Sequence, residues 1–291
     1  MREQALALGR DRRFRALVRN RGAVGGAVLL ALMALLAVGA DVLVRHGPRT
    51  VDLDRILEGP SSLHWLGTDD LGQDLLSRLL HGARISLLVG AVSVGIAVAV
   101  GVPFGAVAGY AGGRADTVMM RFTDVMLAFP SIVLAIAIVA ALGPSLPNLM
   151  VAVGVVAIPN YARQVRASVL EAKGEDYVTA SRALGARPAR ILLRTVLPNC
   201  LAPLLVLATL DYGVAILETA SLSFLGLGPE PGTPEWGKML ADSQNLFSLA
   251  PRVVIAPGLC ISAAVLAFNL LGDGLRDALD PRIREGYEAG R

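Results

Sequence analysis

The stretch E-D-Y-V-T-A-S-R-A-L-G-A-R-P-A-R-I-L-L-R-T-V-L-P-N, from Glu175 to Asn199, is a long polar insert in a mostly apolar sequence. The acidic pair at its start can cap a helix. Gly185 lies where this first helix should end, because glycine accepts the left-handed conformation of a helix C-terminus. Pro188 suits the first position of a second helix, which we expect to end at Pro198. The stretch is therefore predicted to be a helical hairpin.

The first helix of this hairpin has one marked face. Residues spaced at i, i+3, i+4 and i+7 share a side of an α-helix. In this insert those positions hold Tyr177, Ala180, Ser181 and Leu184. An amphipathic hairpin of this kind occurs between membrane spans of many proteins, so the pattern alone leaves its role open.

The composition places the rest of the chain in a membrane. Of 291 residues, 54% are hydrophobic and 18% are charged, and the apolar runs largely lack regularly spaced polar positions. Such a sequence is too apolar for an ordinary soluble domain. Six apolar runs are present, at about 22–44, 85–110, 117–142, 149–161, 201–225 and 253–271. We therefore predict an all-α integral membrane protein with six transmembrane helices.

The polar and apolar runs divide the chain into five parts. They are a basic segment 1–21, a first transmembrane helix 22–44, an extracytoplasmic segment 45–82, a five-helix core 83–271 with the loop 162–198, and a tail 272–291. The fourth apolar run is short, so its helix is expected to extend into residues 163–170. Pro130 should kink the third span near its middle.

Basic residues fix the predicted orientation. With six spans, 20 of the 27 lysines and arginines fall in the segments on the side of the N-terminus. Cytoplasmic segments carry an excess of these residues. Both termini and the hairpin are therefore predicted to be cytoplasmic.

Small residues recur within the second apolar run. Gly101, Gly105 and Gly109 are each four residues apart, a spacing that lets helices approach closely in lipid. This pattern predicts close helix packing.

The hairpin resembles the cytoplasmic loop of ABC importer permeases. The pattern of that family begins Glu-Ala-Ala, has a glycine four residues later and ends in Leu-Pro. The matching residues here are Thr179, Ala180, Ser181, Gly185, Leu197 and Pro198. Threonine replaces the usual glutamate and serine replaces the second alanine, so the spacing, the small residues, the glycine and the Leu-Pro carry the resemblance.

Further stretches are similar to one branch of this family, the permeases for dipeptides, oligopeptides and nickel, and to their second, C-type subunit. The first is H-W-L-G-T-D-D-L-G-Q-D-L-L-S-R, where Gln73 replaces a usual arginine. The others are residues 124–146, 158–166, 220–240 and 269–282. Several motifs in the same order are more specific than the hairpin alone.

The resemblance implies a type I ABC importer permease fold in the cytoplasmic (inner) membrane of a bacterium or archaeon. It implies half of a pore for di- or oligopeptides, completed by a second homologous permease, with two ATPase subunits inside and a solute-binding protein outside. The hairpin would be the ATPase-docking loop, through Asp176, Tyr177, Thr179, Ala180, Ser181, Leu184, Gly185 and Pro198. A nickel or other small-solute importer of this branch, or more distantly a stand-alone channel or secondary carrier, stays an alternative.

ATP and magnesium are expected on partner subunits only. The sequence holds no G-x-x-x-x-G-K-[ST] run, the loop that cradles nucleotide phosphates. No cofactor is therefore expected on this chain.

Two acidic residues lie inside the fifth apolar run. Asp211 and Glu218 are seven residues apart and thus share a helix face. Ionisable groups are costly in lipid and usually face a bundle interior or water. We expect them to line a transport pathway or to pair with a polar group on another helix.

The outer segment Gly226 to Arg252 is rich in proline and glycine and contains Trp236. It is a candidate contact for the binding protein, with Trp236 as its centre. A packed turn would give the same composition.

Catalytic and metal sites are not predicted. Asp69, Asp70 and Asp74 lack calcium-loop spacing, and helix capping or turn formation explains them better than acid–base chemistry. The three histidines are scattered along the sequence and make no cluster with a cysteine. The chain is predicted to be a non-catalytic pore subunit.

Overall fold

The computed structural model describes residues 17–279, which form helices and turns without a named strand. The principal helices are α2 (Arg21–Val38), α3 (Ala40–Leu43), α4 (Leu75–Ala111), α5 (Gly113–Leu127), α6 (Ser131–Leu142), α7 (Leu146–Lys173), α8 (Asp176–Ala183), α9 (Pro188–Ile191), α10 (Leu201–Leu222), α11 (Trp236–Ser243) and α12 (Pro251–Leu279). Most of the basic segment 1–21 and of the tail 272–291 lies outside the described residues. The all-α prediction is confirmed.

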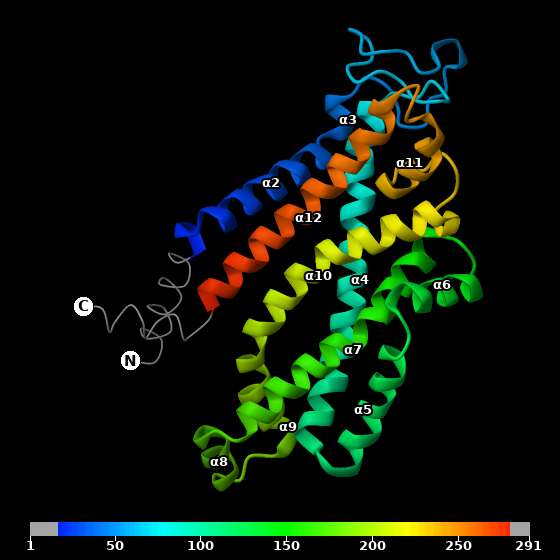
Figure 1. Cartoon of the computed structure of the whole chain (residues 1–291). Helices are drawn as coiled ribbons and strands as arrows, with labels where there is room; N and C mark the ends of the chain where they lie inside the picture. The colour runs from blue at the N-terminus through cyan, green and yellow to red at the C-terminus, as the bar shows by residue number, and fades with distance from the viewer. Residues whose placement is uncertain (1–16, 280–291) are drawn as a thin grey trace.

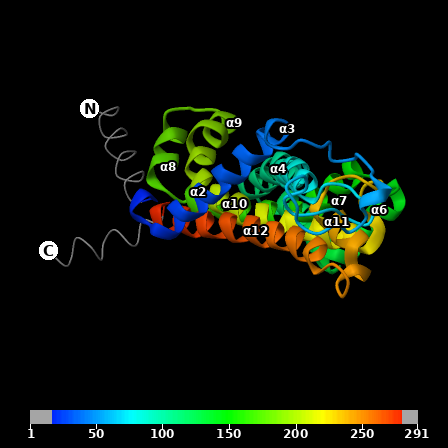
Figure 2. The same cartoon turned by 90° about the horizontal axis from the view of Figure 1, so that it is seen from above.

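The elongated bundle has two distinct ends (Figures 1 and 2). One end holds α8 and α9, together with the first residues of α2 and the last of α12; we call it the hairpin end. The other holds residues 44–74 and α11; we call it the loop end. The polar segments thus alternate between two ends, as the sequence predicts.

Four described helical stretches are long and apolar enough to cross a membrane: α2, α4, the continuous run Pro188–Leu227 and α12. The bent pair α5–α6 makes a fifth if it is one span. Helix α7 has 28 residues, but polar side chains such as Asn160 and Arg163 dilute its second half. Its extension past residue 161 confirms the expected long fourth helix, whereas six spans stay a prediction.

The glycine repeat of α4 packs against α7, as predicted. A Cβ added at Gly101 would lie 2.6 Å from Cβ of Tyr161, and at Gly105 it would meet the backbone of Ala162. At Gly109 it would lie 3.0 Å from the carbonyl oxygen of Arg166. The two helices therefore touch backbone to backbone along this stripe.

The third predicted span bends at Pro130, as expected, and the bend is a complete break between two helices. Helix α5 ends at Leu127 and α6 begins at Ser131, and the two axes differ by 90°. Pro130 precedes α6 with an extended ψ of 133°, because proline disfavours a helix that continues through it. The expected kink is therefore a right-angled break.

Pro198 does not end the second hairpin helix, which corrects the prediction. Residues Leu192–Val196 form a π-helical turn and Leu197–Cys200 a 3₁₀ turn, and the chain then enters α10 directly. These turns accommodate the missing amide hydrogen of proline through other hydrogen-bond spacings. One helical run thus connects Pro188 to Leu227.

Two predicted boundaries also move. Helix α4 begins at Leu75, within the segment 45–82, because Asp74 caps it by accepting a hydrogen bond from the Ser77 amide. Helix α12 continues past residue 271 to Leu279.

Candidate functional site

The helical hairpin at the hairpin end forms as its glycine and proline predict. Helix α8 is followed by Gly185 with φ of +76°, and the amides of Gly185 and Ala186 donate to the carbonyls of Arg182 and Ser181. A Cβ at Gly185 would meet nothing within 4 Å. The requirement for glycine is therefore conformational, since the surrounding space is open. Pro188 opens α9.

A single apolar residue anchors α8 to the bundle. Val178 is fully buried in a cluster that includes Val169 of α7, Ile191 of α9 and Val196 of the π turn. The i, i+3, i+4, i+7 spacing predicted a functional face through Tyr177 and gave no indication that Val178 is buried. The one available indication was that Val178 is a β-branched apolar residue among polar residues.

The predicted face of α8 is turned outward in this chain. Leu184 is 87% exposed and Tyr177 is 40% exposed, and Thr179 and Ala180 are exposed as well. The Ser181 hydroxyl donates a hydrogen bond to the Tyr177 carbonyl oxygen, 2.8 Å away, so its hydrogen is not available to a partner protein. This face presents apolar area that the described chain does not cover.

The hairpin is linked to α10 by side chains as well as by backbone. Asn199 donates its amide to the Tyr177 hydroxyl at 3.3 Å and to the Thr195 carbonyl at 2.8 Å. An open groove of about 730 Å³ lies beside this contact, between α7, α8, α10 and α12, with Glu171 and Arg276 among its lining residues. A displacement of α8 would therefore act on the 3₁₀ turn Leu197–Cys200 that leads into α10.

The two acidic residues of α10 face one cavity, as their spacing predicts. Asp211 and Glu218 line a space of about 160 Å³ together with Ser93, Ser131 and Asn160. Oδ2 of Asp211 is buried and has no hydrogen-bond partner among the described residues. The cavity lies where α5 breaks into α6, so the break gives the carboxylates their space.

The acidic motif before α4 is structural. Asp69 accepts from the amides of Leu71 and Gln73 and pairs with Arg78 at 3.2 Å, both side chains being buried. Burial raises the pKa of Asp69 above its ordinary value, although Arg78 acts in the opposite direction. The expected capping and turn roles of Asp69 and Asp74 are confirmed.

Trp236 does not offer a surface to a binding protein, which corrects the prediction for this residue. Its side chain is 1% exposed, and its indole nitrogen donates to the Leu79 carbonyl at 3.0 Å. Glu235 caps α11 through the amides of Gly237 and Lys238, and burial raises the pKa of that carboxyl. An amphipathic indole is readily buried once its N–H has a partner.

Sequence comparison identifies the family. Residues 101–285 match the model of the binding-protein-dependent transport system inner membrane component. The chain belongs to this family. Residues 11–60 also match the N-terminal transmembrane domain of oligopeptide transport permease C. The predicted resemblance is confirmed, and the matched region of the transport component includes the hairpin, α11 and both acidic residues of α10.

Curated relatives of this transport component cover nearly its whole length. The di/tripeptide transport system permease protein DppC of Pseudomonas aeruginosa is 48% identical, covering 93% of this chain and 91% of the relative. The dipeptide transport system permease protein DppC of Alkalihalophilus pseudofirmus is 46% identical, with 93% and 89% covered. The glutathione transport system permease protein GsiD of Pectobacterium atrosepticum is 45% identical, with 93% and 90% covered.

The fold also matches a solved transporter. A chain in an inward-facing structure of the MetNI methionine ABC transporter superposes with a TM-score of 0.59 at 22% identity, covering 70% of this chain and 96% of that one. The transport component described here therefore has an ABC importer permease fold.

Proposed function

We propose that the chain is one of two homologous permease subunits of an ABC importer for di- or oligopeptides. The observation that carries the proposal is the 43–48% identity, over more than nine-tenths of the chain, to permeases named for dipeptide or di/tripeptide transport. A relative named for glutathione, itself a tripeptide, fits the same cargo class. Nickel is therefore the less favoured cargo.

The second permease completes the pore, and two ATPase subunits bind ATP and magnesium below it. The hairpin end faces the cytoplasm, because the excess of lysine and arginine lies in the segments of that end. A solute-binding protein delivers peptide at the loop end. The chain itself is non-catalytic.

The exposed face of α8 docks into an ATPase. Leu184, Tyr177, Thr179 and Ala180 supply its uncovered area, while Val178 fixes the helix to the bundle from behind. Because a helical run connects Pro188 to Leu227, closure of the ATPases would move α10 through α9 and the Asn199–Tyr177 contact. Such a two-state motion converts nucleotide binding into inward-open and outward-open arrangements.

Asp211 and Glu218 lie on the moving helix and face the cavity beside the α5–α6 break. We assign them to the transport pathway or to its polar lining, since intramembrane carboxylates usually face water or a partner group. A free peptide ammonium group has the charge that such a lining would accept.

Gly185→Asp tests the docking assignment. Aspartate is strained at φ of +76°, so the angle between α8 and α9 should change while the transmembrane helices remain. We expect normal membrane insertion, loss of ATPase co-purification and loss of uptake of a labelled dipeptide. Full retention of the ATPase together with normal uptake would contradict the assignment.

Gly143→Asp is a control for backbone strain, which is expected to be at least as large as at Gly185 because φ of 89° with ψ of 151° is a conformation almost restricted to glycine. Gly143 has φ of +89° and open space around its Cβ position, but it lies in the turn between α6 and α7, away from the hairpin. This variant should keep the ATPase bound.

Uptake of labelled nickel in place of dipeptide by the wild-type transporter would refute the peptide cargo and leave the permease assignment intact.

A further inference from the structure

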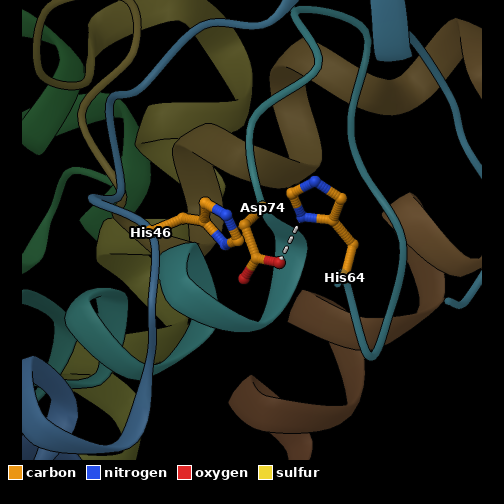
Figure 3. Close-up of side chains that lie close together, drawn as sticks. All are labelled: His46, His64 and Asp74. Carbon is orange, nitrogen blue, oxygen red and sulfur yellow. Dashed lines mark hydrogen bonds and ion pairs between the residues drawn. The ribbon is translucent and has the colours of Figure 1, made fainter. Parts of the chain in front are cut away.

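Two histidines and a carboxylate converge at the loop end, although 28 residues separate the first from the last (Figure 3). His46 follows α3, His64 lies in the loop before α4, and Asp74 caps α4. One possible ligand atom from each lies within 4.8 Å of the other two. Nδ1 of His64 and Oδ2 of Asp74 are already 2.8 Å apart.

We propose that His46, His64 and Asp74 bind a divalent transition-metal ion of the zinc class. Imidazole nitrogen and carboxylate oxygen are ligands that zinc accepts, and three protein ligands leave one position of a tetrahedron for water. Adjacent ligands of tetrahedral zinc are about 3.4 Å apart, given bonds of about 2.1 Å. The His64 and Asp74 atoms, now at a hydrogen-bond distance of 2.8 Å, would move apart by about 0.6 Å to reach that spacing, and His46 would reach it by rotating its half-buried side chain inward.

Hydrogen bonds around the cluster hold the ligands in place. Oδ1 of Asp74 accepts from the Ser77 amide at 2.7 Å, and the Ser77 hydroxyl donates to the His46 carbonyl at 2.7 Å. The His64 amide donates to the Ser61 hydroxyl at 3.0 Å. Supporting contacts of this kind orient metal ligands and reduce the cost of bringing them together.

Two of the three ligands border a space that can hold water. A cavity of about 30 Å³ is lined by His46, Asp74 and Trp65, more than the roughly 10–15 Å³ that one water molecule requires. Arg45 also lines this cavity, and its charge opposes a dication. The affinity for metal should therefore be lower than at a site without a neighbouring cation.

Binding replaces the proton between His64 and Asp74 by the metal. The Nδ1 proton moves to Nε2 by tautomerisation through solvent if the ring is neutral, or is released to solvent if the ring is an imidazolium, and Nδ1 of the neutral imidazole then donates its electron pair to the ion. The ion then ties together the end of the first span, the loop and the start of α4. This role is structural, since the acidic cavity of the pathway is lined by other residues.

The test is cobalt binding by the assembled transporter. The purified complex is stripped with chelator and titrated with Co²⁺, whose visible absorption bands are strong in tetrahedral sites, and Zn²⁺ is then added. We expect one Co²⁺ per chain at the cluster, displaced by Zn²⁺, and a higher midpoint of thermal unfolding. His46→Gln should weaken this binding by at least about tenfold, while the His64–Asp74 contact and the assembly persist.

His81→Gln is the matched control. His81 also pairs with a carboxylate at the loop end, at 3.0 Å from Asp41, but it lies outside the cluster. This variant should bind Co²⁺ like the wild type. The proposal fails if the wild type shows no stoichiometric tetrahedral signal, if His46→Gln keeps that signal, or if both variants lose it equally.

Discussion

The loop end and the hairpin end differ in how far their side chains are buried and partnered within the chain. At the loop end, Asp69 and Arg78 form a buried ion pair and the Trp236 indole has a hydrogen-bond partner. At the hairpin end, Leu184 and Tyr177 extend from α8 with much of their surface uncovered. The loop end thus satisfies its groups within the chain, whereas the hairpin end leaves apolar area that another protein could bury. Substitutions at the two ends should therefore affect different properties.

The largest loss of stability is expected from Arg78→Met. The substitution leaves the Asp69 carboxylate buried without its cation, which should lower the free energy of unfolding by about 4 kcal/mol. Adding Asp69→Asn removes the charge and keeps an oxygen for the Leu71 and Gln73 amides, so most of the stability should return. Thermal unfolding of the detergent-solubilised protein measures both. A single variant as stable as the double variant would refute this description of the loop end.

Gly105→Leu tests the helix contact that joins the two ends. The new side chain would collide with the backbone of α7 at Ala162 and should cost about 3 kcal/mol through overpacking. Gly95→Leu, on the same helix with nothing within 4 Å of its Cβ position, is the control. Equal thermal midpoints for the two variants would show that the glycine stripe does not hold α4 against α7.

A pair of alanine substitutions separates the two faces of α8. Val178→Ala removes fully buried methyl groups and should cost about 2 kcal/mol. Leu184→Ala should change stability by less than about 0.5 kcal/mol but reduce the amount of ATPase that co-purifies. A loss of stability at Leu184 with normal ATPase binding would mean that the outward face is not a docking surface.

Local residue chemistry predicted the parts of this fold that depend on neighbours in sequence. Gly185 and Pro188 define the end of α8 and the start of α9 because each has a strong backbone preference. The spacing of Asp211 and Glu218 is also a local property. Seven residues make about two helical turns, so both side chains lie on one face of α10 and line one cavity.

Features that depend on distant contacts could not be predicted in this way. The burial of Trp236 depends on the Leu79 carbonyl, which is 157 residues away in sequence. His46 and His64 meet only because the segment after α3 folds back to the start of α4 (Figure 3). Pro130 and Pro198 show the same limit, because one lies at a right-angled break and the other within a helical run although the residue type is the same.

The π turn at Leu192–Val196 sets the rotational phase of α10 relative to α9. Each residue of an α-helix advances the chain by about 100°, and a π turn takes in one residue more than an α turn. Removing that residue would rotate Asp211 and Glu218 about 100° away from their cavity, with only a small change in helix length. The orientation of Asp211 and Glu218 toward their cavity therefore depends on the number of residues between the hairpin and α10. A single insertion or deletion in that stretch would rotate both side chains away from the cavity.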